Sequence, residues 1–216
     1  MTTITNTTNT TTNNWVAMTA VTVPVPASTD GRYPAERHLI GIGLFIARHE
    51  DSQWRFARRV HAIPASMPEA TVLENIADRL PAQGMLIGWH VDHALIPTLL
   101  DAAATAPPIV AHHFLGRLHR LLRGGVVDLA LGHGRASFTT IAADMAIRAP
   151  DWDADAVSGS WTSGRTDRLR HDLADEALAI WRVFVRSAGL AGLDAEAATD
   201  AWVAQRKRLH VVKRVD

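Results

Sequence analysis

The residues best suited by type and spacing to take part in chemistry are two acids on one helical segment, Asp172 and Glu176. Residues 168–188 carry apolar side chains, Leu173 among them, at the spacing of an amphipathic helix. At about 100° per residue, Glu176 lies beside this apolar stripe and Asp172 lies one turn earlier on the same side. Asp175 points roughly the opposite way. Carboxylate oxygens bind hard divalent cations, so the pair is a candidate metal site; the alternative is a solvated flank balanced by neighbouring arginines.

A second group of polar side chains lies in residues 88–100, GWHVDHALIPTLL. His90 and His93 are candidate substrate-binding residues and, in their neutral form, candidate metal ligands; a structural role is the alternative. Asp92 is a further acid that would serve a rebuilt metal site. Its preferred interpretation is a cap, through its carboxylate, at the start of the following helix.

Two of the seven tryptophans, Trp89 and Trp161, lie in these candidate regions. A base stacked on an aromatic ring contributes about 1–3 kcal/mol to strand binding, so both are candidate contacts to nucleic acid; packing in the core is the alternative. The pair Gly41-x-Gly43 lies within a predicted strand and lacks the third glycine of a dinucleotide site. It therefore does not predict a nucleotide cofactor.

Composition excludes several classes of function. The 216 residues contain 22 Lys and Arg against 22 Asp and Glu, so net charge does not attract a polyanion, although a local basic face still could. The chain has no cysteine, which excludes thiolate nucleophiles and zinc–thiolate sites. No apolar run reaches the roughly 20 residues of a membrane helix, and the first residues lack the pattern of a secretory signal. We therefore expect a cytoplasmic protein without membrane contact.

Patterning divides the chain into three parts. Residues 1–14 are almost all Thr and Asn and are predicted to be a disordered tail. Residues 15–205 carry the pattern of an α/β domain, and residues 206–216 are a basic end, either solvated or in contact with phosphate. The predicted strands cover residues 16–25, 38–48, 54–63, 85–87 and 126–131, and the predicted helices cover residues 72–80, 95–104, 112–123, 138–147, 168–188 and the segment after 194. Residues 148–166 are predicted to be an irregular connection.

Three strands, then alternating helices and strands, then an acidic helix, is the element order of the ribonuclease-H-like fold. This resemblance implies a mixed five-stranded sheet, antiparallel in its first three strands and parallel afterwards, with helices on both faces. Residues 88–100 resemble the motif G-Y-N-x-x-x-F-D-L-P-x-L of family-B DNA polymerase proofreading exonucleases and their free-standing predicted 3′–5′ exonuclease relatives. Residues 127–129, 138–143 and the helix with Asp172 and Glu176 are similar to later motifs, and the similarity covers about residues 16–190.

The resemblance is weakest where the chemistry requires acids. It implies two ions, Mg²⁺ or Mn²⁺, about 3.5–4 Å apart and held by converging carboxylates. The family motif D-I-E-T-x-P is matched by residues 19–24, with Thr19 and Val21 in the two acidic positions. Leu95 takes the place of the acid of the second motif, and Glu176 aligns with the last acid. Neutral side chains cannot replace ionised metal ligands there.

Three functions follow as hypotheses. The first is an active, metal-dependent 3′–5′ exonuclease whose site is rebuilt from Asp172, Glu176 and Asp92. The second, favoured by the missing acids, is a catalytically impaired or inactive relative that binds single-stranded nucleic acid or a protein partner. The third is an accessory protein-interaction module without nucleic-acid contact.

Overall fold

The computed structural model describes residues 13–25, 36–187 and 194–212. The predicted tail lies outside the described residues, except for its last two residues, which begin the first strand. Most of the predicted basic end, residues 206–216, lies outside the described side chains as well; Arg206 is its described member.

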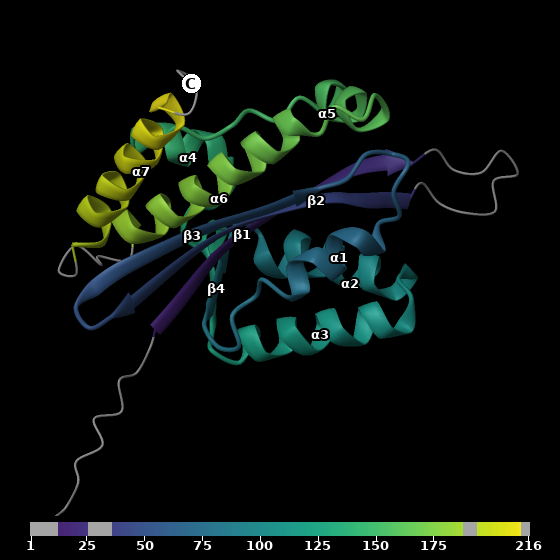
Figure 1. The fold of residues 1–216 in the computed structure, drawn as a ribbon, viewed down its shortest axis with the longest axis horizontal. Helices are drawn as coiled ribbons and strands as arrows, with labels where there is room; N and C mark the ends of the chain where they lie inside the picture. The colour runs from purple at the N-terminus through teal and green to yellow at the C-terminus, as the bar shows by residue number, and fades with distance from the viewer. Residues whose placement is uncertain (1–12, 26–35, 188–193, 213–216) are drawn as a thin grey trace, which may run out of the picture.

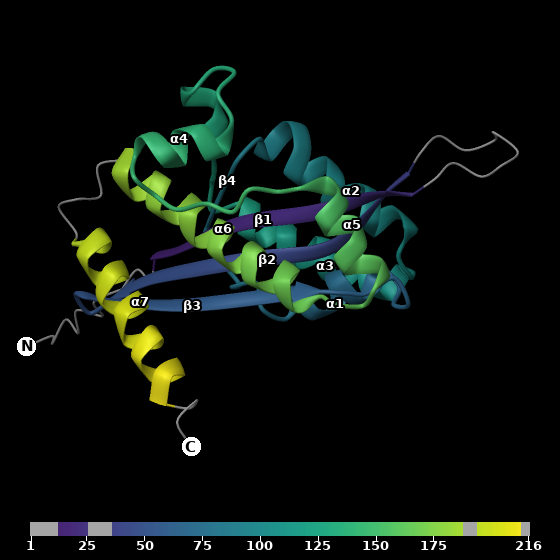
Figure 2. The same ribbon diagram turned by 90° about the horizontal axis from the view of Figure 1, so that it is seen from above.

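Five strands form one mixed sheet in the order β3-β2-β1-β4-β5 (Figures 1 and 2). Antiparallel pairing joins β1 to β2 and β2 to β3, while β4 is parallel to β1 and β5 is parallel to β4. The strands are β1 (Asn13–Val25), β2 (Glu36–Glu50), β3 (Gln53–Ala62), β4 (Met85–Gly88) and β5 (Val126–Asp128). This confirms the predicted α/β class with its mixed sheet, and it places the continuously apolar β2 inside the sheet.

Helices cover both faces of the sheet, as Figure 1 shows. On one face lie α1 (Ala70–Ala77), a π-helical turn (Val91–Leu95), α2 (Ile96–Thr105) and α3 (Pro108–Leu122). On the other lie α4 (Phe138–Asp144), α5 (Ala154–Thr162), α6 (Asp167–Ser187) and α7 (Ala195–Val212). Within the described ranges, no helix has both the length and the apolar character needed to cross a membrane.

Two local predictions were wrong. Residues 148–166 contain α5, which begins because the carboxylate of Asp153 accepts hydrogen bonds from the backbone N–H groups of Asp155 and Ala156. Strand β5 ends at Asp128 rather than at residue 131, because that carboxylate accepts the N–H of Ala130 and starts a 3₁₀ turn. In both cases a short-range side-chain contact decides the backbone conformation.

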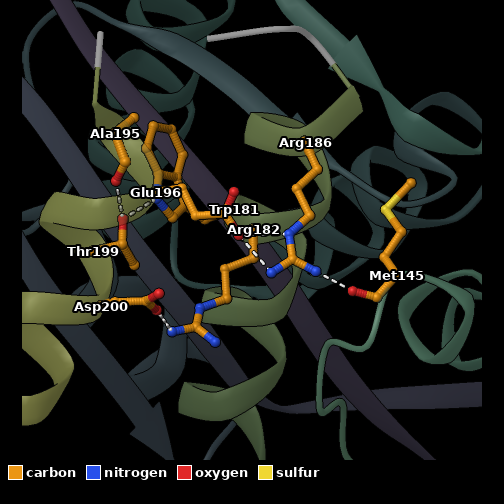
Figure 3. Close-up of polar contacts among 8 residues, drawn as sticks. All are labelled: Met145, Trp181, Arg182, Arg186, Ala195, Glu196, Thr199 and Asp200. Atoms are coloured by element: carbon orange, nitrogen blue, oxygen red, sulfur yellow. Dashed lines mark hydrogen bonds and ion pairs between the residues drawn. The ribbon is translucent and has the colours of Figure 1, made fainter. Parts of the chain in front are cut away.

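Helix α7 is held against α6 by polar contacts (Figure 3). The indole N–H of Trp181 donates to Thr199 Oγ1 at 3.0 Å, and Thr199 donates to the carbonyl of Ala195. Two ion pairs flank this contact, Arg182–Asp200 and Arg186–Glu196. The one polar atom of the buried Trp181 thereby has a hydrogen-bond partner. These contacts fix α7 across β2 and β3, toward the hairpin end that joins the two strands (Figure 2).

Two glycines of β2 let α6 lie unusually close to the sheet. A Cβ atom at Gly43 would overlap the backbone carbonyl of Leu173 on α6, and one at Gly41 would lie 2.7 Å from the Leu173 side chain. The Gly41-x-Gly43 pair is thus explained by helix packing.

We expect Gly43→Ala to destabilise the fold by about 1–3 kcal/mol, because α6 must move away from the sheet to admit the methyl group. Gly116→Ala, in the middle of α3, is the matched control: its Cβ would meet no atom closer than 4.0 Å, so we expect a gain of up to about 1 kcal/mol. Urea unfolding of both variants measures the difference. Equal effects at the two positions would contradict close packing at Gly43.

Candidate functional site

A cavity of about 340 Å³ lies beside β1, beyond the carboxyl end of β4. Strand β4 pairs with β1 only as far as Ala17 opposite Ile87, and β1 continues past this point along the cavity. Ligands of open α/β sheets bind outside the carboxyl ends of parallel strands, where neighbouring connections diverge. The cavity occupies such a position.

The central polar contact of the cavity joins β1 to α6. The buried hydroxyl of Thr19 donates to Glu176 Oε2 at 2.5 Å. Burial raises the pKa of the Glu176 carboxyl above its usual range; hydrogen bonds from Thr19 and from the indole N–H of Trp152 act in the opposite direction, and the nearby charge of Asp172 adds to the rise. Glu176 itself is half-buried, so it still faces the cavity.

Three positions matched by the resemblance to metal-binding acids line this one cavity: Thr19, Leu95 and Glu176. They come from β1, the π-helical turn and α6, and Thr19 and Glu176 are 157 residues apart in the chain. Val21, matched to the fourth acid, also lines the cavity. Leu95 is buried at 6% exposure and offers only apolar surface.

Asp172 does not line the cavity. It lines a separate small pocket beside Arg168, with which it forms an ion pair at 3.6 Å. Asp175 pairs with Arg58 of β3 at 3.0 Å on the opposite flank of α6, as helix geometry predicted. The candidate acid pair is therefore divided: Glu176 belongs to the cavity, and Asp172 matches the predicted arginine-balanced flank.

The polar residues of the segment 88–100 are also divided. His90 lies at the exposed rim of the cavity, whereas Asp92 and His93 are exposed and do not line it. The predicted cap at Asp92 was wrong. The helical turn already begins at Val91, after His90 in a left-handed conformation (φ 51°), so Asp92 lies inside the first turn, where it cannot cap the helix.

The two candidate tryptophans have different surroundings. Trp89 is half-buried and lines the cavity. The centroid of its ring lies 5.9 Å from that of His133, and the two rings are nearly parallel. The ring centroid of Phe138 lies 5.5 Å from that of Trp89. Trp161 lies on α5, packs against the core and does not line the cavity. Of the two, Trp89 is placed to meet a ligand in the cavity.

Two cavity residues were missed in the sequence. Trp152 precedes α5 in a segment predicted to be irregular, and it lines the cavity beside Glu176. Arg37, at the start of β2, is exposed and is the one arginine among the described residues that line the cavity. Neither belongs to a motif, and only the folding of distant segments brings them to β1.

The donor set of the cavity does not fit a two-metal centre. A clamp of this kind requires several converging carboxylates, and among the described residues Glu176 is the only acid that lines the cavity. Across the described ranges, no group of three or more histidine or acidic side chains is arranged to hold a metal ion.

Comparison with known proteins does not assign the chain. No family model matches the sequence, and no curated protein is significantly similar to it.

The raised pKa of Glu176 makes stability depend on pH in a defined direction. The folded protein holds this proton more tightly than the unfolded chain, whose glutamate titrates near pH 4.5. This stabilising contribution is complete below that value and is lost as the pH rises through the folded-state pKa.

We therefore expect the difference in unfolding free energy between the native chain and Glu176→Gln to fall as the pH rises above about 4.5. Urea unfolding across a pH series measures it. The same substitution at exposed Glu74 of α1 controls for the loss of one carboxylate. A difference that rises with pH would show a lowered pKa and contradict the burial of Glu176.

Proposed function

We propose that the chain is a divergent, ribonuclease-H-like relative of 3′–5′ exonucleases that binds single-stranded nucleic acid without cleaving it. The observation that carries the proposal is the meeting of Thr19, Leu95 and Glu176 in one cavity. The resemblance aligned these residues with metal-binding acids from three separate motifs. A chance alignment would have no reason to bring all three to the same place.

The topology supports the proposed family. The strand order β3-β2-β1-β4-β5, with three antiparallel strands followed by two parallel ones, is the order that the ribonuclease-H-like fold uses. The cavity lies between β1 and the segment after β4, where such a fold has its catalytic centre.

The side chains favour binding over hydrolysis. Two of the matched positions hold neutral side chains: Thr19, whose hydroxyl donates to Glu176, and the apolar Leu95. Negative charge therefore does not converge there. The alternative of a rebuilt exonuclease site requires Asp172 and Asp92, which lie outside the cavity. Neither Mg²⁺ nor Mn²⁺ is therefore part of the proposed function.

The cavity offers suitable contacts to a nucleotide unit. The ring of Trp89 provides a surface against which a base can stack, and the guanidinium of Arg37 matches the geometry of a phosphate. Thr22, Thr98 and Glu176 add hydrogen-bonding groups for sugar or base edges. These contacts do not require a metal ion.

We expect the native chain to bind fluorescently labelled single strands in the presence of EDTA, with an affinity that falls as salt is added. Trp89→Leu should weaken binding roughly 5- to 150-fold, the equivalent of one lost stacking contact. Trp161→Leu is the matched control and should leave the affinity unchanged, because this ring lies away from the cavity. Fluorescence anisotropy measures all three proteins.

Two results would contradict the proposal. A melting temperature raised by Mn²⁺ in the native chain but not in Glu176→Ala would reveal a metal site in the folded protein. Absence of strand binding at low salt would favour the accessory protein-interaction module instead.

A further inference from the structure

The free edge of the sheet is rich in arginine. Strand β3 is the outermost strand on its side, and its ten residues include three arginines and no acid. Three more arginines approach this strand from α6, from α7 and from the segment after α1. We call the six residues the arginine edge: Arg55, Arg58, Arg59, Arg79, Arg170 and Arg206.

Guanidinium groups follow the strand at regular intervals. Nitrogen atoms of Arg59, Arg79 and Arg170 lie 3.5, 3.4 and 3.3 Å from three successive outward carbonyl oxygens of β3. These carbonyls belong to the alternate residues Arg58, Val60 and Ala62, so they repeat about every 6.7 Å along the strand. Each guanidinium carries five N–H donors, so most of them stay available to a ligand.

Much of this charge has no acidic partner. Arg58 pairs with Asp175, Arg170 with Asp167, and Arg55 more distantly with Glu50. No described acid lies within ion-pair distance of the other three, Arg59, Arg79 and Arg206. The edge therefore keeps a positive charge although the whole chain has equal numbers of acids and bases.

A groove of about 360 Å³ runs beside this edge, between β3 and α6. Its charged and polar lining consists of Arg58, Arg170, His171 and Arg206 together with one acid, Asp167, the partner of Arg170. Arg206 is held there because α7 is fixed to α6 (Figure 3) and because its guanidinium lies 4.8 Å from the ring of Trp202. The groove lies on the flank of α6 opposite Glu176, so it is separate from the cavity.

We propose that the arginine edge binds the phosphodiester backbone of single-stranded nucleic acid. Guanidinium groups recognise phosphate in a bidentate manner, and a row of them along an extended strand suits an extended chain of phosphates. An acidic protein partner fits less well, because the large hydrophobic side chains exposed in the described ranges all lie outside β3 and offer no apolar anchor there. The inference rests on the proposed function and adds a second contact surface to it.

The test compares two triple variants with equal loss of charge. Arg59→Gln, Arg79→Gln and Arg206→Gln together remove the three unpaired arginines and leave no acid without its partner. The control combines Arg123→Gln, Arg135→Gln and Arg148→Gln, exposed residues in the segments around β5 and α4, and β5 is the strand at the opposite edge of the sheet. Binding of a fluorescein-labelled oligothymidylate is measured by anisotropy over a salt series in EDTA.

The slope of log K against log salt is negative, and each phosphate contact to a single strand contributes about −0.7 to it. Loss of three contacts should therefore make the slope less steep by about 2. The control should keep the native slope. Should the edge triple variant fail to fold, Arg206→Gln alone is expected to make the slope less steep by about 0.7.

Equal slopes for the native chain and the edge variant would overturn this inference and leave the proposed function standing. Equal losses in both triple variants would overturn it too, because only net charge would then matter. Absence of binding by the native chain would overturn the proposed function, and this inference with it.

Discussion

The close packing of α6 on β2 is the constraint on which the other features depend. Without side chains at Gly41 and Gly43, the backbone of α6 reaches the sheet at Leu173. One flank of the helix then places Glu176 beside Thr19, and the other brings Arg170 to the carbonyl of Ala62 at the free edge. The placement of α6 thus determines both the cavity and the charged groove. A larger residue at Gly41 or Gly43 of β2 would disturb the two together.

The hydrogen bond from Thr19 to Glu176 explains why this cavity suits a neutral or weakly charged contact better than a metal ion. A metal centre needs ionised oxygens that converge, whereas the one acid among the described lining residues is partly buried and hydrogen-bonded by neutral donors. Burial favours the protonated carboxyl, and the donors from Thr19 and Trp152 favour the ionised one. Such a group can hydrogen-bond a ligand, but a single carboxyl cannot supply the charge that several converging carboxylates give to a metal centre.

The sequence predicted the strongly periodic parts of the fold well. The alternation and apolar runs located the five strands, and the apolar stripe of residues 168–188 located α6 and the opposed directions of Asp172 and Asp175. The missed features depend on short contacts or on distant segments. The cap at Asp153 starts α5, the left-handed His90 starts the π-helical turn, and Arg37 and Trp152 reach the cavity only in the folded chain. The arginine edge was missed for the same reason, because its members come from β3, α6, α7 and the segment after α1.

The most direct test of the account is cleavage of a 3′-labelled single-stranded oligonucleotide in Mn²⁺ by the native chain, Glu176→Ala and Asp172→Ala, with strand binding followed in the same samples. We expect the native chain to bind the strand and leave it intact, and we expect neither substitution to change this absence of cleavage. Cleavage by the native chain that is lost in Glu176→Ala would contradict this expectation, because the cavity would then hold a working metal centre.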